Sequence, residues 1–147
     1  MTDKGSDISH TAAVTQPTVA DIMRRDPITT SPHATLAAAQ ALMQREDMRQ
    51  LPVIENGALI GILSERDLHA HSGYLERTKV DAAMTASVLT LAPGDSAADA
   101  TRALIAHKIN ALPVVANGQL VGIVSRTDLL RLLVRVLDES PPKRPAR

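Results

Sequence analysis

Hydrophobic and polar positions recur along the chain in two equivalent blocks. At an offset of 61 residues, which places Met23 on Met84, the sequence aligns with itself without a gap over residues 19–68 and 80–129. Self-similarity at a fixed period indicates a duplicated structural unit. The motifs shared in register include Leu51-Pro52-Val53 with Leu112-Pro113-Val114, Asn56-Gly57 with Asn117-Gly118, and Ser64 and Asp67 with Ser125 and Asp128.

Each block shows the same succession of patterns. A short apolar segment precedes a brief strand closed by proline, an alanine-rich helix, two apolar strands and a final helix. In the first block the predicted segments are 19–23, 28–30, 35–49, 51–54 with 59–63, and a helix from 64. In the second block they are 80–84, 88–91, 96–108, 112–115 with 120–124, and a helix from 125.

Local signals support these elements. Thr35 and Ser96 stand where helix N-caps are expected. The Asn-Gly pairs at 56–57 and 117–118 supply the positive φ angles of a tight turn, so each strand pair is predicted to be a hairpin. The result is an α+β fold of two tandem βαββα units. With 147 residues in all, each unit is small, and we expect the two to share their burial.

The last helix is apolar around most of its circumference. Between Asp128 and Asp138 the interior polar residues are Arg131 and Arg135, which with Asp138 follow a spacing of i, i+4, i+7 and form one narrow stripe. A helix with so wide an apolar surface is covered on two sides. One side faces its own sheet, and the other predicts a homodimer with this helix in the contact.

Composition narrows the function further. Sixteen basic residues balance sixteen acidic ones, and Tyr74 is the single aromatic side chain among Phe, Trp and Tyr. Nucleic-acid binding is therefore disfavoured, because both a basic excess and stacking platforms are missing. No apolar run approaches the roughly 20 residues of a membrane span, and we expect a cytoplasmic protein. Residues 1–17 are predicted to be a disordered leader and 139–147 a flexible tail.

The sequence offers no catalytic or metal-binding signature. It has no cysteine, and no P-loop, dinucleotide-binding glycine motif, zinc-protease motif or nucleophile-elbow motif. His69 and His71 are two residues apart and do not face each other on a helix, so they do not indicate a metal site. We expect a protein that is not an enzyme and requires no metal or cofactor.

The motif Gly-Ile-x-Ser-x-x-Asp occurs twice, ending at Asp67 and Asp128. One interpretation is structural, since Ser-x-x-Asp resembles a capping box that satisfies free N–H groups at a helix start. The other is functional. A helix start attracts phosphate, and a nearby carboxylate accepts hydrogen bonds from ribose hydroxyls.

The order of elements and the doubled motifs resemble a tandem pair of CBS domains, also called a Bateman module, as found in stand-alone CBS domain-containing proteins. The resemblance covers residues 18–76 as CBS domain 1 and 77–138 as CBS domain 2. It implies two units packed sheet against sheet about a pseudo-twofold axis. It also implies regulation by an adenosine ligand, either AMP, ADP, ATP or S-adenosylmethionine, bound in clefts between the units and signalled to a partner protein.

The resemblance also implies which residues line each cleft. In the second cleft the ribose and phosphates would lie against Asp128, Ser125, Arg126 and Thr127, with the base near Thr90, Asn110, Ala111 and Pro113. The first cleft would use Asp67, Ser64 and Arg66, with Thr29, Gln50 and Pro52.

The two clefts are not equivalent. Glu65 stands where the second copy has Arg126, and a carboxylate near a phosphate is unfavourable. We therefore expect the second cleft to bind ligand more strongly. The alternative function is a structural or dimerisation subunit of a larger complex, whose clefts hold no ligand.

Overall fold

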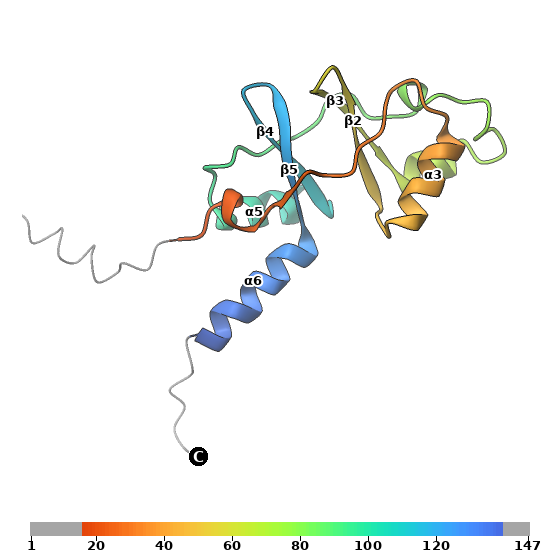
Figure 1. Cartoon of the computed structure of the whole chain (residues 1–147). Coiled ribbons are helices and arrows are strands. Elements are labelled where there is room, and N and C mark those ends of the chain that lie inside the picture. Colours follow the sequence, from red (N-terminus) through yellow and green to blue (C-terminus); the bar gives the residue numbers. More distant parts are fainter. Residues whose placement is uncertain (1–15, 140–147) are drawn as a thin grey trace, which may run out of the picture.

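The structure, a computed structural model, describes residues 16–139, so the predicted leader and tail lie almost entirely outside the described residues. Helices and strands alternate as two similar units (Figure 1). The first unit contains α3 (Leu36–Arg45), β2 (Gln50–Glu55), β3 (Ala58–Ser64) and α4 (Glu65–Ala70). The second contains α5 (Ala97–His107), β4 (Ala111–Ala116), β5 (Gln119–Ser125) and α6 (Arg126–Glu139). Short segments precede each unit: α2 (Val19–Ile22) and β1 (Arg24–Arg25) before the first, and a 3-10 turn (Val80–Ala82) before the second.

Both predicted hairpins are confirmed. The strands β2 and β3 pair antiparallel, as do β4 and β5, and each pair shifts register at the equivalent place, after Val53 and after Val114. Asn56 and Asn117 have φ values of 55° and 53°, and the following glycines have φ values of 83° and 78°. These positive angles are those of the turn that the Asn-Gly pairs predict.

The first predicted strand of each unit is reduced to a single bridge. Thr30 pairs with Val53, and Leu91 with Val114, both in parallel orientation. Pro32 and Pro93 follow two residues later and have no N–H with which to extend the ladder. The two hairpins meet through one residue pair, and all the strands form one five-stranded sheet in the order β1-β5-β3-β2 with β4 on β5.

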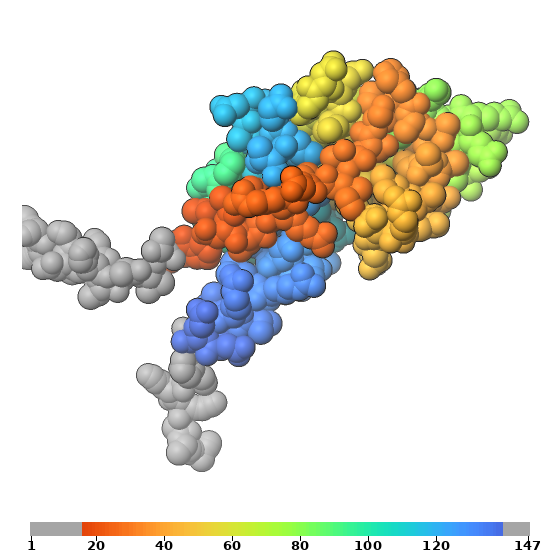
Figure 2. All heavy atoms as spheres, in the orientation of Figure 1, coloured from red at the N-terminus to blue at the C-terminus, as the bar shows by residue number. Residues whose placement is uncertain are grey.

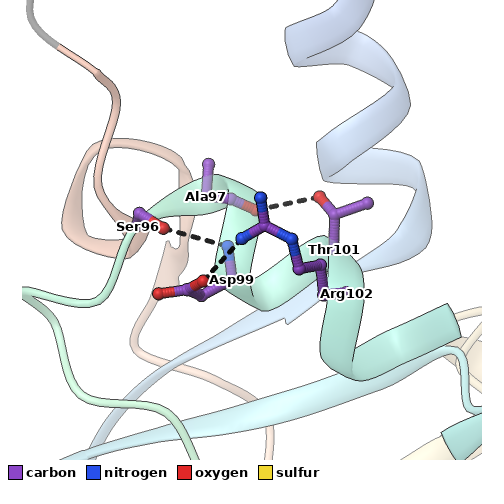
Figure 3. A network of polar contacts seen from close by, with 5 residues as sticks. All are labelled: Ser96, Ala97, Asp99, Thr101 and Arg102. Atoms are coloured by element: carbon purple, nitrogen blue, oxygen red, sulfur yellow. Dashed lines mark hydrogen bonds and ion pairs between the residues drawn. The ribbon is translucent and has the colours of Figure 1, made fainter. Parts of the chain in front are cut away.

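The predicted helix starts are confirmed, and one predicted helix end is wrong. The Thr35 and Ser96 hydroxyls accept hydrogen bonds from Ala38 N and Asp99 N, and Figure 3 shows the first turn of α5 with its cap. Helix α3 ends at Arg45 rather than near residue 49. Asp47 has a φ of 55°, and Met48 N donates to Met43 O at 2.8 Å, which closes the helix. Lys108 and Ile109 close α5 in the same way.

The hydrophobic core of each unit contains a residue from the segment that precedes the other unit. Val19, which precedes the first unit, is fully buried in the core of the second, among Leu104, Val114 and Val124. Val80, its counterpart at the offset of 61, is fully buried in the core of the first, among Leu36 and residues of β2 and β3. Each unit therefore completes its core with a segment that the sequence assigns to the other.

The exchange continues in the sheet. Strand β1 pairs with β5 through Arg24 and Ile123, and in reciprocal fashion Thr85 bridges to Ile62 of β3. The methionine before each crossing lies on a glycine of the opposite unit. A Cβ atom built on Gly122 would be 2.6 Å from the Met23 sulfur and 2.9 Å from the Arg24 carbonyl oxygen. Gly61 is covered in the same way by Met84.

The close contact of Gly122 with Met23 and Arg24 predicts that a methyl group added to this glycine destabilises the fold. Gly122→Ala should lower the free energy of unfolding by about 1–3 kcal/mol, because the backbone of residue 24 must move to admit the new atom. Gly94→Ala is the matched control, since a Cβ there meets no atom within 4 Å. Urea denaturation measures both, and equal stability of the two variants would contradict the contact.

Candidate functional site

Both Ser-x-x-Asp motifs form complete capping boxes at the starts of α4 and α6. Asp128 Oδ2 accepts hydrogen bonds from Ser125 N at 2.8 Å and from the Ser125 hydroxyl at 2.9 Å, and Asp128 N donates back to that hydroxyl. Asp67 and Ser64 repeat the arrangement at 2.8 and 3.0 Å. As whole residues, Asp67 and Asp128 are half-buried. Among the hydrogen bonds of residues 16–139, those to either carboxylate all end on Oδ2, and none ends on Oδ1.

A third box shows that this geometry alone does not define a ligand site. Asp21 Oδ2 accepts from Thr18 N at 2.8 Å and from the Thr18 hydroxyl at 3.1 Å, at the start of α2. The backbone N–H of Thr18, and then its hydroxyl, hold the pKa of the Asp21 carboxyl below its ordinary value. The sequence interpretation overlooked this box, although its Thr-x-x-Asp pattern was visible. What separates Asp67 and Asp128 from Asp21 is their surroundings.

The second Ser-x-x-Asp box lies beside the residues that the resemblance places near the base. Ala111 pairs with Ser125 across the hairpin, and Asn110 O accepts a hydrogen bond from Arg126 N at 2.8 Å. Pro113 O accepts from the backbone N–H of Leu91, the residue after Thr90. The structure thus arranges these predicted residues along the start of β4, next to the capped start of α6. Pro113 is buried, whereas Asn110 and Thr90 are exposed.

The first box has equivalent neighbours. Gln50 pairs with Ser64 across the hairpin, and Glu65 N donates to Arg49 O at 3.1 Å. Pro52 O accepts from Thr30 N at 3.0 Å, which brings Thr29 close to the start of β2. The main chain therefore builds the same framework twice.

The remaining predicted residues lie on the exposed surface. Arg66 and Thr127 occupy the exposed first turns of α4 and α6, and among the described hydrogen bonds none links their side chains to the boxes. Arg126 is also exposed, and it borders a groove on the helical face of its unit. The structure brings together the serines, aspartates and strand-start residues, but it does not join these three side chains to them.

The two helical faces carry grooves that the sequence did not indicate. One of about 540 Å³ lies between α3 and α4, and we call it the first-unit groove. One of about 600 Å³ lies between α5 and α6, and we call it the second-unit groove. Nine of the residues that line the first lie at an offset of 61 from residues that line the second. Glu65 and Arg126 are one such pair, so the charge difference between the copies is presented to these grooves.

Two other kinds of site are not found in the part of the chain that the structure describes. No three His, Asp or Glu side chains of residues 16–139 come together in an arrangement that could hold a metal ion. No helix in the same range has both the length and the hydropathy of a transmembrane segment.

Comparisons with known proteins agree with this architecture. Over 114 residues the chain is 34% identical to the CBS domain-containing protein YhcV of Bacillus subtilis, with 76% of this chain and 81% of that protein covered. The AcuB protein of Vibrio cholerae has a crystal structure that is 34% identical, with a TM-score of 0.79 over 87% of this chain and all of that one. The crystal structure of CBSX2 in complex with AMP is 29% identical, with a TM-score of 0.76 over 82% of this chain and 98% of that one.

The sequence profile of the CBS domain matches twice, at residues 19–72 and 80–135. These two matches include both hairpins and both capped helices of the structure. The α+β architecture and the tandem duplication inferred from the sequence are confirmed. The chain belongs to the CBS-domain family, of which it contains a tandem pair.

Proposed function

We propose that this CBS pair is a regulatory module that binds an adenosine-containing ligand in the two clefts between its units and signals to a partner protein. The observation that carries the proposal is the pair of carboxylates of Asp67 and Asp128, each held through Oδ2 beside a strand start, with Oδ1 not used by the cap. A ribose hydroxyl is a suitable donor to that oxygen. The AMP complex of the similar protein CBSX2 supports this class of ligand.

The ligand would act by a difference in affinity between two arrangements of the units. A bound nucleotide stabilises the arrangement that it binds more tightly, and by no more than that difference. The reciprocal contacts of Met23 on Gly122 and Met84 on Gly61 link the two units. In this proposal the module catalyses no reaction, and AMP, ADP, ATP and S-adenosylmethionine are the ligands to compare.

A second candidate function rests on a different observation. Leu130, Leu133 and Leu137 of α6 are 50–59% exposed, which is unusual for leucines on one helix. Such a surface favours a structural or dimerisation subunit whose clefts hold no ligand. The two functions are distinguished by ligand binding.

A ligand screen by thermal unfolding tests the sensor. AMP, ADP, ATP or S-adenosylmethionine at 100 times its dissociation constant should stabilise the folded chain by about 2.7 kcal/mol, because only the folded state has the clefts. NADH is included as a larger adenosine compound. A melting temperature that stays constant with every compound would exclude the sensor and favour the structural subunit.

Calorimetry with variants tests the site. Asp128→Asn keeps an acceptor for the Ser125 cap but removes the charge, so AMP should bind about tenfold more weakly or worse. Asp67→Asn tests the first cleft in the same way, and the larger of the two losses identifies the cleft that binds AMP more strongly. Asp21→Asn is the matched control, because it changes an equivalent box in another place and should leave affinity unchanged. Unchanged AMP affinity in Asp128→Asn would remove that residue from the site.

We also propose that the protein is a homodimer, because the apolar α6 surface is exposed in the single chain. Sedimentation equilibrium at micromolar concentration should then give twice the mass of the chain. A mass equal to that of one chain would refute the dimer without affecting the ligand site.

A further inference from the structure

The segment that precedes the first unit brings two arginines to the sheet of the second. After α2 the chain runs alongside the second unit before it reaches the first (Figures 1 and 2). Arg24 and Arg25 form β1 and pair with Ile123 and Gly122 of β5. Both arginines are exposed. Because β5 ends at Ser125, a residue of the proposed second cleft, the direction of each arginine side chain decides whether it can reach a ligand there.

The pattern of burial identifies the two faces of β5. Val124 is fully buried in the core of the second unit, together with residues of α5 and α6. Its neighbour Ile123 is also buried, but it is not part of that core. Since successive side chains of a strand point to opposite faces, Ile123 and Ser125 lie on the face turned away from the helices. Pro113 and Ala111, which pair with them across the hairpin, lie on this same face.

Arg24 lies on the face of the predicted cleft residues. It pairs with Ile123, and paired residues of adjacent strands have their side chains on the same side. Met23, one residue earlier, packs against the core of the second unit and so points the opposite way. Arg24 is diagonal to Ser125, a separation of about 7–8 Å that a long side chain can span. Within residues 16–139, no hydrogen bond or ion pair involves the Arg24 side chain.

Arg25 points to the other face of the sheet. It pairs with Gly122, and Val114, which pairs with Gly122 from β4, is fully buried in the core of the second unit. The Arg25 Nη2 atom donates to Ala20 O of α2 at 3.1 Å. The two arginines therefore carry the same charge at adjacent positions, but only Arg24 is directed to the cleft face.

The first unit has no arginine at the equivalent position. Thr85 is the counterpart of Arg24 at the offset of 61, and it bridges to Ile62 of β3 through two backbone hydrogen bonds of 2.9 Å. The reverse holds at the helix starts, where Arg66 of α4 corresponds to Thr127 of α6. Of these two positions, each unit thus has an arginine at one and a threonine at the other. In the second unit the arginine comes from the segment that leads into the first.

We infer that Arg24 binds the phosphate of a nucleotide in the second cleft and makes that cleft selective for phosphorylated adenosine compounds. This inference rests on the proposed ligand function and specifies one of its contacts. A guanidinium is suited to the contact, because its N–H groups can donate to two phosphate oxygens at once.

The order of the strands agrees with the order of groups in a nucleotide. Ala111 and Pro113 on β4 are the residues assigned to the base, and Asp128, just after β5, is assigned to the ribose. Arg24 lies on β1, beyond β5 from the base. From β4 to β1 is two strand spacings, or about 10 Å. The ribose of a nucleotide stands between its base and its phosphate, as Asp128 stands between the other two positions.

Calorimetry with AMP and adenosine separates a phosphate contact from a general effect on the cleft. Arg24→Gln should weaken AMP binding at least about tenfold and adenosine binding less than about twofold, because it removes a charged partner that only the phosphate uses. Arg24→Lys keeps the charge and should lose less AMP affinity than Arg24→Gln. Arg25→Gln is the matched control, since it removes the same charge from the other face and should leave both affinities unchanged.

Thermal unfolding verifies that all three variants fold. A parent protein that binds neither AMP nor adenosine would overturn the adenosine ligand and this inference together. Three results would overturn the Arg24 contact alone: a parent that binds AMP no more tightly than adenosine, an AMP affinity that Arg24→Gln leaves unchanged, and equal losses of AMP affinity in Arg24→Gln and Arg25→Gln. The last result would mean that net charge, and not the position of Arg24, determines AMP affinity.

Discussion

The structure depends on a reciprocal exchange between its two units. The segment that precedes each unit is buried in the core of the other, at Val19 and Val80, and then crosses the other sheet with a methionine held against a strand glycine. Neither unit completes its hydrophobic core or its sheet alone. Because both crossings obey the same geometry, they impose the approximate twofold relation between the units, and with it the placement of the two capped helix starts.

Duplication has preserved backbone features and allowed surfaces to diverge. The Asn-Gly turns, the serine caps and the left-handed residues that end α3 and α5 recur at the offset of 61, since each satisfies a local requirement of the main chain. The main chain places no such requirement on the side chains of the helical faces. The groove of the first unit is lined largely by polar side chains and that of the second largely by apolar ones.

The carboxylates of the motif illustrate why a pattern by itself is ambiguous. In three boxes of this chain the carboxylate accepts from the backbone N–H and the hydroxyl of the capping residue, and the box at Asp21 lies at the start of a short helix. For Asp67 and Asp128 the cap and the proposed ligand contact are compatible, because the cap uses one carboxylate oxygen. Capping would hold the other in a fixed direction before any ligand arrives, which lowers the ordering cost of binding.

The sequence alone determined the elements whose causes are local: the hairpins from Asn-Gly, the helix starts from Thr35 and Ser96, and the duplication from its period. It also placed Ser125 and Asp128 beside the strand start, through the resemblance. The sequence prediction was wrong for the end of α3, which the left-handed residue Asp47 closes. It was also wrong for the first strand of each unit, which is reduced to a single bridge. Only the tertiary structure decided the exchange of core segments and the two unlike grooves. Those features depend on contacts between residues far apart in the chain, and no short-range pattern encodes such contacts.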